Sequence, residues 1–91
     1  MAKNHSSHAS EEFWELYDAL PVEVQEQADK QFTLFRENLF HPSLRLKQIG
    51  DLWIARVSRS YRALAWRQGN VFYWFWIGNH EDYEEALKRL M

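Results

Sequence analysis

The 91-residue sequence predicts an α+β domain, in which an N-terminal helical hairpin packs on an antiparallel β-meander and a short C-terminal helix follows. Three observations support this prediction. Apolar residues recur at helical spacing through residues 13–39, three apolar runs with short polar links come next, and a last helical pattern ends the chain. A chain of this length allows one core, so we expect residues 10–91 to form a single domain behind a flexible arm of residues 1–9.

Two helices are expected in the N-terminal half. Ser10 is a favourable N-cap, and the acidic residues after it complement the positive end of a helix dipole. Apolar residues then recur at helical spacing, at Phe13, Leu16, Tyr17 and Leu20. Pro21 separates this segment from a second pattern, which predicts a longer helix from about Val22 to about Asn38. The two segments therefore form a helical hairpin.

Strand-like runs follow the break at residues 41–43. Residues 44–49 alternate in character, which predicts a first strand of the meander. Three further runs span residues 52–58, 61–67 and 71–77. The links between them are short, which favours antiparallel pairing. The last run is apolar on both faces, so we expect it to lie inside the sheet with Trp74 or Trp76 buried.

A C-terminal helix is expected directly after the last strand. Asn79 with Asp82 three residues later resembles an N-cap arrangement. Tyr83, Leu87 and Leu90 then recur at helical spacing. The imidazole of His80 should therefore lie where strand and helix meet.

Charge is segregated along the chain, although the formal net charge is only -2 at pH 7. Residues 44–67 carry six basic side chains and one acidic one, a local balance of +5. Residues 11–29 carry seven acidic side chains and no basic one. A basic sheet is therefore expected beside an acidic helical layer, and a polyanion would bind the sheet. The alternative is that the two sets pair with each other or form separate solvated faces.

The composition limits the kind of protein. Without cysteine, the chain can form neither a disulfide framework nor a thiolate zinc site. It has no apolar run of about 18 residues to span a bilayer, and its first ten residues lack the apolar stretch of a secretory signal. We expect a cytoplasmic protein without membrane association, metal or cofactor.

One group of residues could carry chemistry. RNA is cut without metal when a base removes the 2'-hydroxyl proton, an acid protonates the 5' leaving oxygen and cations hold the charge on phosphorus. Imidazole can act as base or acid, a phenol can orient a phosphate or stack on a base, and guanidinium groups match phosphate oxygens. We therefore expect His80, Tyr83 and Arg62 to be catalytic. Arg56, Arg59 and Arg62 are expected to bind RNA phosphates.

Structural interpretations of the same residues stay open. A strand arginine often pairs with an acid or covers apolar surface, and a histidine after a strand is often a capping or surface residue. A two-residue turn would set Val57 opposite Arg62, whereas a three-residue turn would set Arg56 there. Four aromatic residues form either part of the core or a platform on which bases stack. They are Trp66, Phe72, Trp74 and Trp76.

Two segments, LWIARVSRSYRALAWR and FYWFWIGNHEDYEEAL, resemble the W-x-x-R-V-x-x-x-Y-R strand pair and the closing IG-x-H-x-x-Y segment of the RelE/ParE superfamily. These are bacterial toxins of toxin-antitoxin pairs, and the resemblance covers about residues 11–87. It implies an endoribonuclease that cuts ribosome-bound mRNA or, alternatively, a non-enzymatic inhibitor of a protein target such as DNA gyrase. It also implies a cognate antitoxin, phosphate binding by Arg56 and Arg62, and catalysis or stacking by His80 and Tyr83.

Two features depart from the family pattern. Family members usually begin with a strand, whereas MAKNHSSHAS lacks a strand pattern, which predicts an incomplete sheet or one completed by a partner's strand. Family members are also commonly basic, whereas this chain has a net charge of -2. An inactive relic of the fold, with a structural or partner-binding role, is therefore a third interpretation.

Overall fold

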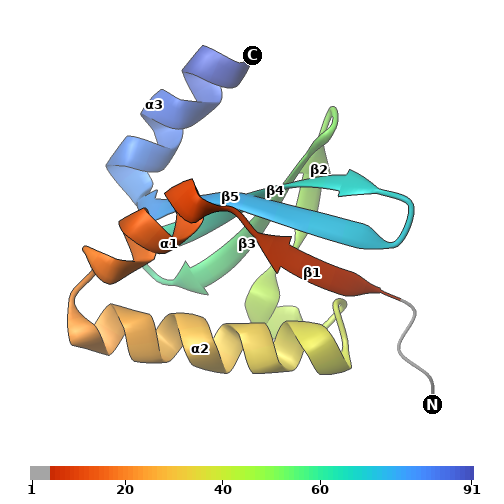
Figure 1. Ribbon diagram of the computed structural model, residues 1–91, viewed down its shortest axis with the longest axis horizontal. Coiled ribbons are helices and arrows are strands. Elements are labelled where there is room, and N and C mark those ends of the chain that lie inside the picture. The colour runs from red at the N-terminus through yellow and green to blue at the C-terminus, as the bar shows by residue number, and fades with distance from the viewer. Residues whose placement is uncertain (1–4) are drawn as a thin grey trace.

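The computed structural model describes residues 5–91, in which five strands form one sheet in the order β1-β5-β4-β3-β2 (Figure 1). The strands are β1 (Ser6–Ala9), β2 (Lys47–Ile49), β3 (Leu52–Ser58), β4 (Tyr61–Gln68) and β5 (Val71–Asn79). The helices are α1 (Glu11–Asp18), α2 (Val22–Glu37) and α3 (His80–Leu90), with a 3-10 turn η1 (Pro42–Leu44) before β2. The predicted α+β class is confirmed: β2 to β5 form an antiparallel meander.

Local capping explains where the helices begin. The Ser10 hydroxyl accepts a hydrogen bond from the Phe13 backbone N–H at 3.1 Å, and the Asn79 side chain accepts one from the Asp82 N–H at 2.8 Å. Both caps were expected, because short polar side chains satisfy N–H groups that the first helical turn leaves without partners. The second cap starts α3 at the residue after β5, which places His80 at the junction.

The first strand corrects the predicted flexible arm of residues 1–9 over its second half, residues 6–9. Ser6–Ala9 pairs in parallel with the start of β5, so the chain supplies its own edge strand and needs none from a partner. The Trp74 indole N–H also donates to the Ser7 hydroxyl at 3.3 Å. The sequence hides this strand because its pairing is through the backbone and its side chains are mostly polar. Residues 1–4 lie outside the described residues.

The strand predicted over residues 44–49 is shorter than expected. Leu44 ends η1 and is buried in the core, and Arg45 takes a left-handed backbone conformation with φ of 44°. Only Lys47–Ile49 then pairs with β3. The apolar alternation arises because Leu44 reaches the core from a turn and not from a strand.

The helices cover the two faces of the sheet unequally (Figure 1). On one face, here called the hairpin face, α1 packs over β5 and α2 over β3. The core there contains ten buried residues: Val24, Phe35, Leu44, Ala55, Val57, Ala63, Ala65, Phe72, Trp74 and Ile77. On the other, here called the α3 face, α3 contacts β4 and β5 over a smaller cluster of Ile54, Leu64 and Tyr83. The predicted burial of Trp74 is confirmed, at 7% exposed.

Candidate nucleic-acid interface

A β-bulge decides how the predicted arginines are arranged. Arg59-Ser60 form a two-residue turn, yet Arg56 lies opposite Arg62, because the register shifts between Arg56 and Ser58 and leaves Val57 as an extra residue. The outcome is the pairing that the sequence left open, reached by a bulge and not by a longer loop. Residues directly opposite on antiparallel strands share a face, so two guanidinium groups start side by side on the α3 face.

Arg62 is held in place by the turn that it follows. Its Nη1 donates to the carbonyl oxygens of Ser58 at 2.8 Å and of Tyr61 at 2.9 Å. Burial lowers the pKa of Arg62, and the neighbouring charge of Arg56 lowers it further. The group still carries its charge at neutral pH, so this corner of the sheet keeps like charges together and favours an anion.

The basic strands are not neutralised by the acidic helices. Among the residues that the structure describes, no arginine of the sheet forms an ion pair with an acid of α1 or α2. The helical acids and the sheet arginines therefore act as separate surfaces, as the segregation of charge along the sequence suggested. Arg59 is exposed in the β3–β4 turn, at the end of the same hairpin.

The start of α3 brings the two other predicted residues to the arginines. The His80 backbone N–H donates to the Ser60 carbonyl at 2.7 Å, which ties the helix to the β3–β4 turn. The ring centroids of His80 and Tyr83 lie 5.3 Å apart. Tyr83 is buried, and burial raises its pKa while the charge of Arg62 opposes the rise. The His80 side chain is 46% exposed, with Nδ1 3.9 Å from a carboxylate oxygen of Glu84.

A glycine permits close packing beside this corner. Gly78 lies opposite Arg62, and a Cβ atom on Gly78 would lie 2.7 Å from the Trp76 ring. That distance is shorter than real Cβ contacts, so any larger residue would force the indole to move. The glycine of the IGNH segment therefore has a packing role next to the candidate site.

A partly exposed row of aromatic side chains extends from the site across the α3 face. Trp66 stacks on Phe75 with ring centroids 5.3 Å apart, and Tyr73 stacks on His8 at 5.7 Å. Trp66 and Tyr73 are direct cross-strand partners, which joins the two stacks into one row over β4, β5 and β1. We call these four residues the aromatic row.

The aromatic row differs from the platform that the sequence suggested. Phe72 and Trp74 belong to the buried core, whereas Trp66 is 39% exposed. A register shift in the β4–β5 pairing sets Leu64 opposite Trp76 and Ala65 opposite Trp74, so Phe75 is the extra residue. Strict alternation along β5 could have separated Tyr73 and Phe75 from the core set. His8 could not be found, because its strand was not predicted.

Arg67 lies apart from the site. Its guanidinium carbon is 4.9 Å from the centroid of the Phe72 ring and 5.1 Å from that of Trp53. Its Nε donates to the Gly69 carbonyl oxygen at 2.8 Å. Arg67 therefore covers core aromatic rings near the β4–β5 turn, the structural role common for a strand arginine.

The structure offers neither a metal site nor a membrane-spanning helix within the described residues. Within residues 5–91, no group of three or more His, Cys, Asp or Glu side chains could hold a metal ion. The histidine nearest the N-terminus in this range, His5, is bound to the fold through Nε2, 2.6 Å from the Phe35 carbonyl oxygen. None of the helices in the same range is both long enough and apolar enough to cross a membrane.

Solved structures share this fold at low sequence identity. The DinJ-YafQ toxin-antitoxin complex of E. coli has a TM-score of 0.69 and 9% identity, covering 87% of this chain and 96% of that chain. The isolated E. coli RelE toxin has a TM-score of 0.61 and 22% identity, covering 96% and 99%. The YoeB/ParE toxin from Agrobacterium tumefaciens has a TM-score of 0.65 and 11% identity, covering 82% and 98%. No curated protein sequence matches the chain.

The fold is therefore that of the small toxins of toxin-antitoxin pairs. The family model of the ParE-like toxin domain matches residues 22–85. The chain belongs to that family and so to the RelE/ParE superfamily of toxins.

Proposed function

We propose that this toxin is a metal-independent endoribonuclease that cuts ribosome-bound mRNA and so inhibits translation in the cytoplasm. The observation that carries the proposal is the corner where Arg56 and Arg62 lie side by side with Tyr83 and His80 next to them. Guanidinium groups that are partly desolvated bind phosphate oxygens strongly, and an imidazole and a phenol beside them can move protons. These are the groups that RNA cleavage without metal requires.

The proposed reaction assigns one role to each side chain. His80 takes the proton of the 2'-hydroxyl, the 2' oxygen attacks phosphorus and the bond to the 5' oxygen breaks. Tyr83, a phenol that is protonated at neutral pH, donates its proton to the leaving oxygen and regains one from water. Arg56 and Arg62 stabilise the charge that develops on the phosphoryl oxygens. The products are a 2',3'-cyclic phosphate and a 5'-hydroxyl, and His80 returns its proton to water.

The aromatic row supports a single-stranded substrate. Every base has a flat face that can stack on an exposed ring, and such contacts contribute about 1 to 3 kcal/mol per base. Trp66 and Tyr73 offer exposed rings on the same face of the sheet as the arginines. In this proposal, Arg56, Arg59 and Arg62 bind phosphates while nearby bases stack on the row.

The test is mRNA cleavage by the purified chain in a translating extract. Loss of one charge-assisted contact to phosphate in a desolvated site costs about 1.5 to 3 kcal/mol, so Arg62→Ala should cleave ~10 to 150-fold more slowly. His80→Ala should also lose most activity. Arg67→Ala is the matched control, because it removes the same charge from the core aromatic rings and should leave cleavage unchanged. Full activity in both Arg62→Ala and His80→Ala would rule out the nuclease proposal.

We also infer that a small antitoxin protein binds and neutralises this chain. The DinJ-YafQ and RelB-RelE structures with this fold are toxin-antitoxin complexes. Co-expression of the protein encoded next to this toxin should restore growth, and that protein should copurify with the toxin. Continued growth arrest in the presence of that protein would show that the neighbouring protein is not the antitoxin.

A second candidate function is inhibition of a protein target such as DNA gyrase. The match to the ParE-like family model and the acidic outer helices favour it, because neither requires a nucleic-acid substrate. A gyrase supercoiling assay separates the two candidates. Inhibition that persists in His80→Ala, with no cleavage of mRNA, would favour this second function.

A further inference from the structure

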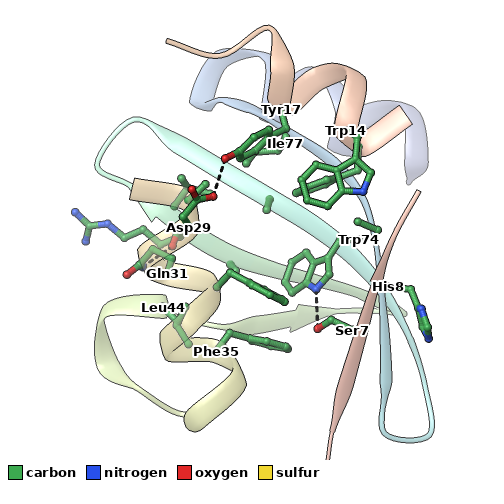
Figure 2. A pocket seen from close by; sticks show the side chains of 18 residues that line it. Ser7, His8, Trp14, Tyr17, Asp29, Gln31, Phe35, Leu44, Trp74 and Ile77 are labelled. Carbon is green, nitrogen blue, oxygen red and sulfur yellow. Dashed lines mark hydrogen bonds between the residues drawn. The ribbon is translucent and has the colours of Figure 1, made fainter. Parts of the chain in front are cut away.

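We propose that the space between the helical hairpin and the sheet is a binding site for a small, neutral aromatic molecule of about the size of indole. Figure 2 shows this cavity, which has a volume of about 200 Å³ and lies on the hairpin face of the sheet. The proposal does not depend on the nuclease activity, although Arg56 of the candidate RNA site also lines the cavity. Its shape, lining and opening each support the proposal.

The cavity exists because small residues lie beneath the gap between two helices. α1 packs over β5 and α2 over β3, so β4 passes between them. At that point β4 presents Ala63, and its cross-strand partner on β3 is Ala55. Both alanines line the cavity, and both side chains are too short to reach the helices above. The fold therefore leaves a hollow where two larger residues would fill the core.

The walls of the hollow are chiefly aromatic and aliphatic. Apolar side chains from both helices, the sheet and η1 contribute, among them Phe13, Tyr17, Phe35, Leu44, Trp74 and Ile77. Figure 2 shows the ring of Trp74 beside the cavity, fixed by its hydrogen bond to Ser7. Apolar cavities of about 150 Å³ remain dry and bind benzene, so a larger one can hold a bicyclic ring. Asp29 and Arg56 also line the cavity, but most of its wall is apolar and would desolvate a charged ligand, so we expect the ligand to be neutral.

The cavity opens to solvent between the helices. Two of its lining residues are large and exposed, Trp14 at 50% and Phe32 at 43%. The Tyr17 hydroxyl donates to the Asp29 carboxylate at 2.7 Å, which connects α1 to α2 across the rim (Figure 2). Side-chain motion at this rim is enough to admit a small molecule, because the backbone frame behind it is held in place.

That frame is anchored by a glutamine of α2. Gln31 Nε2 donates to the Arg56 carbonyl oxygen at 2.8 Å and to the Ser43 carbonyl oxygen at 3.1 Å. These bonds fix α2 to β3 and to η1 at the far end of the cavity. A site with a fixed frame needs little rearrangement to bind a ligand.

The experiment is titration of the purified chain with indole, followed by NMR and by thermal unfolding. The methyl resonances of Leu44 and Ile77 should shift with saturation, whereas those of Leu87, on the α3 face, should not. At tenfold excess over its dissociation constant, indole should raise the folding equilibrium constant about elevenfold. Indole-3-acetate, which carries a carboxylate, should bind at least tenfold more weakly.

Cavity-filling variants decide the location. Ala63→Leu should retain the fold and lose indole binding, and Ala55→Val provides the same test if Ala63→Leu does not fold. Ala86→Leu adds a similar volume on α3, outside the cavity, and should bind indole as the wild type does. Absence of saturable binding to the wild type, or equal binding by the filled variants, would overturn the proposal.

Discussion

The two faces of the sheet differ in how far their aromatic side chains are exposed to solvent. On the hairpin face, Phe72 and Trp74 of β5 are 0% and 7% exposed, whereas on the α3 face Trp66 of β4 and Tyr73 of β5 are 39% and 42% exposed. Residue type does not explain the difference. Two helices cover the first face, whereas one helix, α3, covers part of the second and packs mainly on β4 and β5. One face therefore supplies most of the stability, and the other keeps rings and cations available for a ligand.

The largest effect on stability is expected from a substitution in the core of the hairpin face. Trp74→Ala removes a buried indole and should lower the free energy of unfolding by about 3 to 5 kcal/mol. Trp66→Ala, on the exposed row, should lower it by no more than about 1 kcal/mol. Urea unfolding of both variants measures the contrast, and equal losses would show that the two faces contribute alike.

The next prediction addresses the α3 face through salt. If Arg56, Arg59 and Arg62 each neutralise one phosphate, the affinity for single-stranded RNA should fall with a log-log slope of about -2 against salt concentration. Arg62→Ala should reduce that slope by about 0.7, and Arg67→Ala should leave it unchanged. Binding titrations at several ionic strengths provide the slopes. A flat response in the wild type would favour the protein-directed function.

A smaller effect compares the two helix caps. Ser10→Ala on α1 and Asn79→Ala on α3 each remove one side-chain acceptor and should each cost about 1 kcal/mol of stability. The cap at Asn79 also positions the residue after it, His80. RNA cleavage should therefore fall in Asn79→Ala and remain normal in Ser10→Ala at temperatures where both variants are folded. Equal cleavage activity in the two variants would show that the reaction does not depend on the position of His80.

The smallest expected effect concerns pH and the hairpin. The hydrogen bond to Asp29 raises the pKa of Tyr17 to about 12, from an ordinary value of about 10. Because folding raises this pKa, the folded chain keeps the proton to a higher pH than the unfolded chain does. The contribution of Tyr17 to the free energy of unfolding is therefore fully present below pH 10 and is lost as the pH rises towards 12. Tyr17→Phe should flatten the pH dependence of unfolding in that range. Tyr73→Phe, on the other face, is the control and should leave it unchanged.

Local features of the sequence predicted most of the fold. Helical spacing and the caps at Ser10 and Asn79 determine α1 and α3, because each depends on residues within one or two turns. The burial of Trp74 also followed, from a run that is apolar on both faces. The short strand β1 was missed because it is defined by backbone pairing with residues far along the chain.

The candidate site was predictable in composition but not in arrangement. The residue types pointed to Arg62, His80 and Tyr83. The pairing of Arg56 with Arg62, however, depends on the bulge at Val57, and the place of His80 beside this hairpin depends on its hydrogen bond to Ser60. Bulges are set by packing on both faces of a sheet, which a single strand's pattern does not encode. The aromatic row depends on two further non-local features, the bulge at Phe75 and the pairing of β1 with β5.

The parallel pairing of β1 with β5 also has a consequence for the order of folding. The hydrogen bond between Ser7 and Trp74 joins residues 67 positions apart, so closing this edge has a larger entropic cost than forming any hairpin of the meander. During synthesis, Ser7 leaves the ribosome long before Trp74 exists. The nascent chain can form α1 and α2 early, but it must wait for β5 before the hairpin face acquires its edge and its last large core ring.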